Sequence, residues 1–584
     1  MIYILLEPLL LVGVVYLAAA LSHCLFILKW RGLRFGLLSF FLCILLERSI
    51  GLPLHHSLYL PGILIFLLQT IPYAFVRGHV SVVEERDYGE GKHEYFLGLC
   101  GLVFLSLGEA WKGQLGISLP VMVLEWLYLS FSFSGAVTYV IYYFMYHNVF
   151  QQEDMLPVLL TDRKEAKDFI CAGLGWKRLS AGILLILFYL VFSVGLFSLR
   201  PVEIISPAAP LSIVTAIIAI LFFRTNLRKA FPVKHYLRAR AIERNMADTQ
   251  SQHQKNLEKL IVKQKGKTGN VLLIIGESAN RDHMKAFNPD YPIDTTPWQT
   301  SMKGKKGWYF YPHAYSNFSQ TARSLSMILT GLNQYNHQSA DWFITILDIA
   351  KACGMDTWWI SNQTKVDKTD DYTTYISGKA DHELWTNPSK GDEAKLLDLL
   401  DQVPEEGSHF IILHLMGSHL RYEGRIPPDW EILKTPGQSS RVGLYDTTLK
   451  YTDEILRRIM KKAEEKFHAD AVVYVSDHSE DMKYTHGTGH FTYDMLHIPL
   501  WIYLSPEMEK AHPEMAEVLA RHEDQIFTND LIFDTLCGIL RAPNTAYTPR
   551  FDLTSPEYDL PLEEARGQHG KVKISEDPAL QMEK

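Results

Sequence analysis

Six long apolar segments in the first 224 residues constrain the fold of this chain more than any other feature. A bilayer core of about 30 Å is crossed by roughly 20 apolar residues in a helix. The segments of that length are 4–28, 34–53, 58–78, 117–146, 178–199 and 204–223. A shorter run, 95–111, fits an interfacial position, and we expect no cleavable signal peptide because the first segment lacks a basic stretch before it. The sequence therefore predicts a polytopic α-helical membrane domain over residues 1–224, with about five to seven helices.

Loop charges favour a position outside the cytoplasm for the second half of the chain. With six spans, Lys29, Arg31 and Arg34 fall in a cytoplasmic loop, as the positive-inside rule requires. Basic residues directly after the last span argue the other way, but such residues can also bind anionic headgroups. Seven spans would reverse the orientation. Residues 225–268, rich in Arg, Lys, Gln and Glu, are expected to form an amphipathic linker.

From residue 269 to 584 the sequence is mixed and charged, which is typical of a globular domain. The formal net charge of the chain is −8, which argues against a nucleic-acid binder. Only Cys353 and Cys537 of the six cysteines lie in this half, and no CxxC pair occurs, so a thiolate zinc site is not supported. These two cysteines could form one disulfide or remain buried thiols, and the sequence leaves both alternatives open.

Short apolar runs in the second half stop abruptly at polar clusters. The runs are 271–275, 357–360, 410–413 and 471–475, and helix-like stretches such as 391–402 and 443–466 lie between them. Alternating strands and helices predict an α/β domain with a parallel sheet covered by helices on both faces. Because ligand sites in such sheets lie at the carboxyl ends of the strands, we expect the polar clusters to converge there.

The residues expected to converge carry carboxylates and imidazoles. They are Glu277, His419, Asp477, His478 and His486, with His490 and His497 as further candidates. Such a set without thiolates suits zinc or manganese. Asp477 and His478 are adjacent at a strand end, where the chain already turns, so both side chains can reach one ion. Glu277 alone would more often be a helix cap or an ion-pair partner, and the prediction therefore depends on the joint pattern.

Thr321 is the candidate nucleophile. A helix-like apolar pattern follows it, which places its hydroxyl near a helix N-terminus, where backbone N–H groups favour an anion such as phosphate. Taken alone, Thr321 would more often be a simple N-cap. A threonine hydroxyl becomes a nucleophile only when a base or a metal activates it, and zinc provides such activation.

These residues resemble the membrane-anchored phosphoethanolamine transferases of Gram-negative envelopes, within the alkaline phosphatase/sulfatase-like superfamily. The resemblance covers most of the globular half and extends to the membrane half in layout only. The motifs that carry it are GES at 276–278, QT at 320–321, WISNQ at 359–363, MGSH at 416–419, SDHSED at 476–481 and HG at 486–487. It implies a sulfatase-like catalytic domain over 269–584, with a mostly parallel sheet between helices.

The resemblance also implies a site and a reaction. Glu277, Thr321, Asp477 and His478 would bind one or two zinc ions, with manganese as the alternative metal. Thr321 would carry phosphoethanolamine transiently, while His419 and His486 would hold the phosphoryl group or protonate the leaving group. The donor would be phosphatidylethanolamine and the acceptor a lipopolysaccharide, at lipid A or an inner-core sugar. The enzyme would lie in a bacterial inner membrane with its catalytic domain in the periplasm.

A polar stretch between two spans, 150–177, resembles the substrate-side helix of the same family. Thr161 and Glu165 are four residues apart and would share one helix face. They could contact the ammonium of the donor headgroup. The alternative is a solvated charged helix without a role in the reaction.

Two departures and three alternatives bear on this interpretation. Ser479 stands where the family motif commonly has glycine, and the globular half can form at most one disulfide where well-studied lipid A-modifying members carry several, so the acceptor stays open. A glycerophosphate transferase or a phosphodiesterase would use the same metal and threonine. A sulfatase would need a cysteine or serine in a C/S-x-P-x-R context, which Thr321-Ala-Arg-Ser-Leu lacks. A non-catalytic membrane protein would usually have lost part of the intact metal and threonine set.

Overall fold

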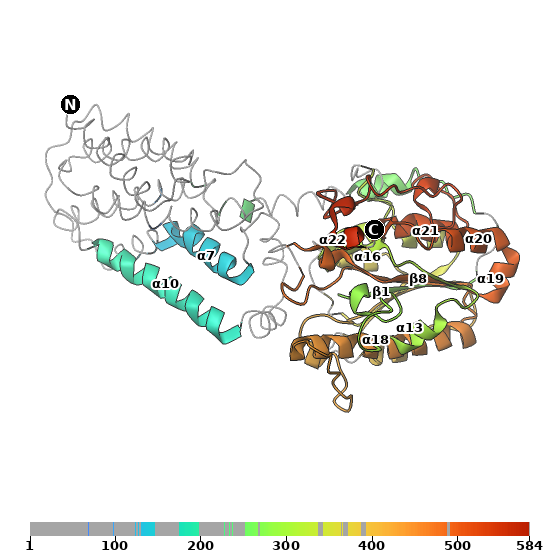
Figure 1. The fold of residues 1–584 in the computed structure, drawn as a ribbon. Helices are drawn as coiled ribbons and strands as arrows, with labels where there is room; N and C mark the ends of the chain where they lie inside the picture. Colours follow the sequence, from blue (N-terminus) through green and yellow to red (C-terminus); the bar gives the residue numbers. More distant parts are fainter. Residues whose placement is uncertain are drawn as a thin grey trace, which may run out of the picture. The chain divides into compact units, whose positions relative to one another are not determined.

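The computed structural model describes residues 130–146, 175–197 and 251–582, with a few isolated positions upstream. Short gaps lie at 265, 267–268, 337–342, 364, 366–371, 387–392 and 487–490. The chain divides into two compact units, Met1–Ile242 and Glu243–Lys584. The division falls within the predicted linker, and each unit is described by itself (Figure 1).

In the first unit the structure describes two helices, α7 (Ser134–Tyr146) and α10 (Gly175–Phe197). They overlap the predicted segments 117–146 and 178–199. The rings of Phe133 and Tyr189 pack at a centroid distance of 5.1 Å. Among the described residues, none of the helices combines the length and the hydropathy needed to cross a membrane. The other predicted spans, and the pair Thr161 and Glu165, lie outside the described residues.

The second unit contains one seven-stranded mixed sheet, in the order β2-β8-β7-β1-β6-β4-β5. Its strands are β1 (Val271–Gly276), β2 (Trp308–Phe310), β4 (Asp356–Ser361), β5 (His382–Trp385), β6 (His409–His414), β7 (Ala471–Ser476) and β8 (Leu500–Leu504). The four strands predicted from sequence are confirmed, and the five strands from β7 to β5 are parallel. Strand β8 runs antiparallel to β7 and β2, which the sequence did not predict. A parallel strand needs a crossover connection, and the described part of 477–499 holds only a short 3-10 helix.

Helices cover the sheet on both sides (Figure 1). The helices are α13 (Pro297–Met302), α14 (Thr321–Ile328), α15 (Ile346–Ala352), α16 (Tyr372–Ser377), α17 (Lys395–Leu400), α18 (Ser440–Glu465), α19 (Pro506–Ala511), α20 (Pro513–Arg521), α21 (Ile532–Ile539) and α22 (Pro578–Met582). Short 3-10 helices are η3 (Arg281–His283), η5 (Tyr422–Gly424), η6 (Tyr493–Leu496), η7 (Asn529–Leu531), η8 (Pro549–Phe551) and η9 (Ile574–Glu576). Two small sheets pair β3 (Ala314–Tyr315) with β9 (Phe527–Thr528), and β10 (Arg566–Gly567) with β11 (Val572–Lys573).

The apolar runs are continuous because the central strands are buried on both faces. Alternate residues of β1 enter two separate cores: Leu273 packs with residues of α14, α15 and α21, and Leu272 packs with residues of α17 and α18. The predicted helix 443–466 corresponds to α18. Cys353 and Cys537 are both free thiols, so the disulfide alternative is not realised.

Candidate active site

The site lies at the carboxyl ends of three neighbouring strands, β7, β1 and β6. Gly276 at the end of β1 pairs with Ser476 at the end of β7, so the residues that follow them emerge side by side. The N–H of Asp477 donates to the carbonyl of Gly276 at 3.0 Å, and the N–H of Ser418 donates to the carbonyl of Glu277 at 3.0 Å. The polar clusters that follow these strands therefore meet at one edge of the sheet.

Glu277, Asp477 and His478 form a buried group whose candidate ligand atoms all lie within 4.8 Å of one another. His478 Nε2 is 3.4 Å from Glu277 Oε1 and 3.5 Å from Asp477 Oδ2. His478 Nδ1 lies 3.0 Å from the carbonyl oxygen of Ser479. A carbonyl can only accept, so the proton sits on Nδ1 and the lone pair of Nε2 faces the two carboxylates.

This arrangement fits a divalent cation. Asp477 Oδ2 is buried and has no hydrogen-bond partner. A buried carboxylate oxygen and an imidazole lone pair that face each other without a proton between them are unfavourable unless a cation lies there. Ser479, which replaces the usual glycine, contributes through its backbone carbonyl and is not among the residues with positive φ, so the serine brings no backbone strain.

Thr321 is the first residue of α14, directly after the N-cap Gln320. Its hydroxyl donates to Glu277 Oε2 at 3.0 Å and lies 3.4 Å from His478 Nε2. The side chain therefore faces the metal-type group, which consists of Glu277, Asp477 and His478, and does not act as the helix cap. Ser324 on the same helix donates to the carbonyl of Asp477 at 2.6 Å, and Asn529 Nδ2 donates to the same carbonyl at 2.8 Å. These bonds fix the start of α14 against the end of β7.

The turn after β6 is held against Glu277. Gly417 has a φ of +45°, and a Cβ at this position would lie 2.8 Å from the carbonyl oxygen of Glu277. The buried Glu393 accepts from the N–H of Gly417 at 2.8 Å and from that of Met416 at 3.1 Å. Burial raises the pKa of Glu393 to about 7, although these backbone bonds lower it. Gln363 Nε2 donates to Glu277 Oε2 at 3.3 Å.

His419 and His486 lie beside the buried group, on its more open side. The rings of His478 and His486 are 4.5 Å apart, and those of His419 and His486 are 5.8 Å apart. Thr321, His419 and His486 are partly exposed, whereas Glu277, Asp477 and His478 are buried. A substrate can therefore reach the hydroxyl and the two imidazoles from solvent.

The two histidines differ in the role of Nδ1, which accepts a hydrogen bond in His419 and donates one in His486. Arg425 Nη2 lies 3.3 Å from His419 Nδ1, and because a guanidinium can only donate, the proton of His419 is on Nε2. His486 Nδ1 bonds to Glu480 Oε2, and because a carboxylate accepts, its proton is on Nδ1. Burial lowers the pKa of His419 to about 3. Burial also disfavours the charge of His486, but Glu480 outweighs it and raises the pKa of His486 to about 9.

Three supporting residues receive no role from the sequence: Arg425, Glu480 and Glu393, which holds the turn after β6. Arg425 belongs to none of the motifs, and its role follows only from its contact with His419. Glu480 lies within the SDHSED motif but was given no role. It is fully buried, accepts from the hydroxyl of Tyr422 at 2.9 Å and lies 3.5 Å from Arg441 Nη2. No sequence pattern identifies Arg425, whereas the motif around Glu480 could have drawn attention to it.

His497 does not join this site. Its Nδ1 lies 2.6 Å from Asp282 Oδ2 and its Nε2 lies 2.7 Å from Asp577 Oδ2, so both nitrogens donate and neither has a lone pair for a metal. Burial and Arg281 lower the pKa of His497, but the two aspartates more than offset them and raise it. His490, like Thr161 and Glu165, lies outside the described residues.

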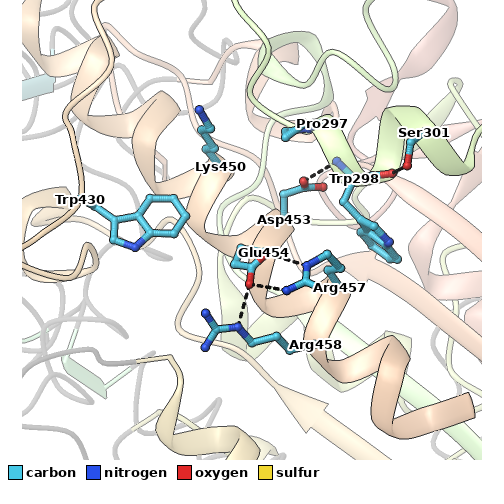
Figure 2. A pocket seen from close by; sticks show the side chains of 9 residues that line it. All are labelled: Pro297, Trp298, Ser301, Trp430, Lys450, Asp453, Glu454, Arg457 and Arg458. Carbon is cyan, nitrogen blue, oxygen red and sulfur yellow. Dashed lines mark hydrogen bonds and ion pairs between the residues drawn. The ribbon is translucent and has the colours of Figure 1, made fainter. Parts of the chain in front are cut away.

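A cavity of about 530 Å³ lies elsewhere, along α18 and the start of α13 (Figure 2). None of its lining residues belongs to the site at the strand ends. It is lined by Pro297, Trp298, Ser301, Trp430, Lys450, Asp453, Glu454, Arg457 and Arg458.

Comparison with known proteins relates this domain to one family and to named relatives. Residues 269–540 match the family model described as Sulfatase. The chain is 31% identical over 217 residues to phosphoethanolamine transferase OpgE of Escherichia coli, covering 35% of this chain and 39% of the relative. It is 24% identical over 321 residues to phosphoethanolamine transferase CptA of Salmonella typhimurium, covering 49% and 53%. The chain thus spans about half or less of the length of these curated relatives.

One solved structure has a similar fold over most of the chain. It is the integral membrane protein lipooligosaccharide phosphoethanolamine transferase A of Neisseria meningitidis, with a TM-score of 0.54 and 16% identity. The alignment covers 84% of this chain and 97% of that protein. At this identity the likeness concerns the fold alone.

Proposed function

We propose that the protein is a zinc-dependent phosphoethanolamine transferase whose residues 269–540, which match the Sulfatase family model, form a catalytic domain of the alkaline phosphatase/sulfatase-like superfamily. The observation that carries the proposal is the hydroxyl of Thr321, 3.0 Å from Glu277 and 3.4 Å from His478 in the metal-type group. A threonine at this position is not converted to the formylglycine that sulfatases use. The names of the curated relatives support the reaction class.

Glu277, Asp477 and His478, together with Thr321, would hold the metal. Zinc bound there would favour loss of the hydroxyl proton and polarise a phosphoryl oxygen. Asp477 Oδ2 and His478 Nε2 offer free lone pairs to such an ion. The backbone N–H of Ser278 holds the other oxygen of Asp477 at 3.2 Å, which orients the carboxylate.

In the first half-reaction the donor would be phosphatidylethanolamine. A bond forms between Thr321 Oγ and phosphorus while the bond from phosphorus to the glycerol oxygen breaks, and diacylglycerol leaves. Glu277 Oε2 accepts the hydrogen bond of the Thr321 hydroxyl and is the nearest acceptor for its proton. His486 would protonate the leaving oxygen, and His419 would donate from Nε2 to a phosphoryl oxygen, which stabilises the charge of the transition state.

In the second half-reaction a hydroxyl or phosphate oxygen of a lipopolysaccharide would attack phosphorus, the bond from phosphorus to Thr321 Oγ would break, and Thr321 would regain its proton from Glu277. His486 would now accept the proton of the attacking group, because the same residue serves both directions. Donor and acceptor are both lipids, so the predicted membrane domain 1–224 would hold the catalytic domain at their leaflet, on the periplasmic side of a bacterial inner membrane. Thr161 and Glu165 would contact the donor headgroup.

Intact-mass measurement after incubation with phosphatidylethanolamine tests the proposal. The wild type should gain one phosphoethanolamine group, and Thr321→Ala should gain none. Ser326→Ala is the matched control, because Ser326 is on the same helix and its hydroxyl bonds to the carbonyl of Arg323. A chelator should abolish the adduct, and added zinc should restore it. A wild type that holds zinc but stays unmodified would contradict the donor and point to a glycerophosphate donor or to hydrolysis.

A further inference from the structure

The cavity on α18 is lined by indole rings and cations, whereas the candidate active site is built from carboxylates and imidazoles. It opens between two indole rings, Trp298 of α13 and Trp430 of the loop that joins β6 to α18 (Figure 2). Three cations on α18, Lys450, Arg457 and Arg458, line it as well. A cavity of about 530 Å³ lies within the usual size range of sites for small ligands, roughly 300–1,000 Å³.

The cations of the cavity are only partly neutralised. Glu454 accepts from Arg457 Nε and Arg458 Nε at 2.7 and 2.8 Å, which holds both guanidinium groups in place. Their side chains remain 48% and 45% exposed. Lys450 makes no ion pair with the other lining residues (Figure 2). One carboxylate therefore faces three cations, and an anionic group of a ligand can complete the balance.

Asp453, the second carboxylate of the lining, makes no ion pair with the three cations. It points at the start of α13, where it accepts from the N–H of Trp298 at 2.8 Å and from the side chain of Gln299 at 2.9 Å. Burial raises the pKa of Asp453 to about 6, although the bonds from Gln299 lower it. The carboxylate is thus used to fix α13, and with it Trp298, on α18.

Both indoles are held before any ligand arrives. Trp298 packs edge-on against Trp308 at a centroid distance of 5.6 Å, and Trp430 packs edge-on against Tyr451 at 4.9 Å. Rings fixed in this way lose little conformational entropy when a ligand binds. Flat aromatic faces suit the C–H faces of sugar rings, and arginine and lysine suit phosphate.

The cavity is connected to the active site by two elements. Trp430 belongs to the same loop as Arg425, which contacts His419. Helix α18 begins at the site, where the hydroxyl of Tyr445 donates to the carbonyl of Ser278 at 2.7 Å. Lys450 is five residues further along the helix, which is about 8 Å. An acceptor bound in the cavity would therefore lie along the same helix that contacts Ser278, next to the proposed metal ligand Glu277.

We propose that this cavity binds an anionic saccharide, the phosphorylated sugar portion of the acceptor, with Trp298 and Trp430 stacking on sugar rings and Lys450, Arg457 and Arg458 binding phosphate. The inference rests on the proposed transferase function for the identity of the acceptor. The binding chemistry itself depends only on the walls of the cavity.

Calorimetric titration of the full chain, reconstituted in nanodiscs of phosphatidylcholine, tests the proposal. The probes are a phosphorylated core oligosaccharide freed of its lipid, the same oligosaccharide after removal of phosphate, and vesicles of phosphatidylglycerol. Trp430→Ala and Lys450→Gln should each weaken binding of the phosphorylated probe at least tenfold, and removal of phosphate should weaken binding to the wild type. Lys461→Gln is the matched control, because Lys461 lies on α18 outside the cavity and pairs with Glu465 at 3.8 Å. It should bind like the wild type.

The phosphoethanolamine adduct on Thr321 is measured in parallel on the wild type, to show whether the donor half-reaction takes place. If Trp430→Ala and Lys450→Gln bind the phosphorylated probe like Lys461→Gln, the saccharide site is overturned. If the wild type binds the vesicles but no oligosaccharide, and the two variants lose vesicle binding, the saccharide site is overturned in favour of a lipid-headgroup site. Oligosaccharide binding without any adduct would retain the cavity site and refute the proposed function instead.

Discussion

Replacing Gly417 by alanine is the sharpest test of how the site is built. Gly417 has a φ of +45°, and an added Cβ would lie 2.8 Å from the carbonyl oxygen and 3.2 Å from the nitrogen of Glu277. Both are backbone atoms of the residue proposed as a metal ligand, so no flexible side chain can move aside. Gly437 is the matched control, because its φ is +72° and nothing lies within 4 Å of its added Cβ.

The two substitutions share one cost and differ in another. A side chain in the left-handed region costs roughly 1–2 kcal/mol of folding free energy. Alanine also lowers the conformational entropy of the unfolded chain, which stabilises the folded state by about 0.4–1 kcal/mol. Gly437→Ala should therefore lower the free energy of unfolding by about 1 kcal/mol. Gly417→Ala adds the clash with Glu277, and overpacking of this kind costs about 1–3 kcal/mol. Its total loss should be roughly 2–4 kcal/mol.

The difference should be larger in activity than in stability. A displacement of about 1 Å near a reacting group can lower a rate about 100-fold, and Glu277 contacts the hydroxyl of Thr321 directly. The assay is the rate of phosphoethanolamine adduct formation on Thr321, measured with the zinc content and the Tm of each variant in the same detergent. Gly417→Ala should lose about 100-fold in rate and part of its zinc, while Gly437→Ala keeps both. Equal rates for the two variants would refute the reasoning.

Three further predictions concern the contact of Arg425 with His419, the separate buried His497 and the bound metal. In Arg425→Met the proton of His419 would no longer be held on Nε2, and kcat should fall roughly tenfold with little change in KM. Arg425→Lys keeps a hydrogen-bond donor and should keep most of the rate. Equal losses of rate in the two variants would contradict the assigned tautomer. The raised pKa of His497 means that its contribution to stability is fully present below about pH 6.5 and is lost as the pH rises through the folded-state pKa. The lowered pKa of Asp282, about 2, means that its contribution is present above about pH 3.8 and is lost as the pH falls toward 2. The difference in Tm between wild type and His497→Gln should accordingly be largest near pH 5 and shrink in alkaline buffer, and a difference that grows with pH would reverse the assigned charge. Removal of the metal by a chelator should lower the Tm of the wild type and leave that of Asp477→Asn nearly unchanged, since ligand binding stabilises the folded state. An equal shift in Tm for both proteins would show that the metal does not bind at Asp477.

The centre of the fold was predictable because its strands are buried on both faces. Such strands appear as continuous apolar runs, and β1, β6 and β7 were identified in that way. The polar residues directly after each run were expected to meet, since carboxyl ends of parallel strands share one edge. The direction of β8 was not predictable, because it is set by a connection whose described part holds only a short 3-10 helix.

The supporting residues could not be predicted because their roles depend on contacts between distant segments. Glu393 holds the turn at Met416 and Gly417, and nothing in its local sequence points to that turn. Thr321 was expected near a helix N-terminus, and it is the first residue of α14. Whether its hydroxyl would cap the helix depended on Gln320, which occupies the cap position and leaves the hydroxyl free for Glu277.

The two partly exposed histidines differ in a way that the proposed two-step transfer would require. One group must give a proton to the first leaving oxygen and take one from the second attacking group, so its proton must be mobile. His486 meets this need, because Glu480 supports the charged ring while Nε2 remains for the substrate. The other group must donate to the phosphoryl oxygens in both steps without exchanging its proton. His419 meets that need, because Arg425 occupies Nδ1, keeps the proton on Nε2 and disfavours a second one. A guanidinium behind one imidazole and a carboxylate behind the other would thus divide the work of the proposed transfer between two otherwise identical side chains.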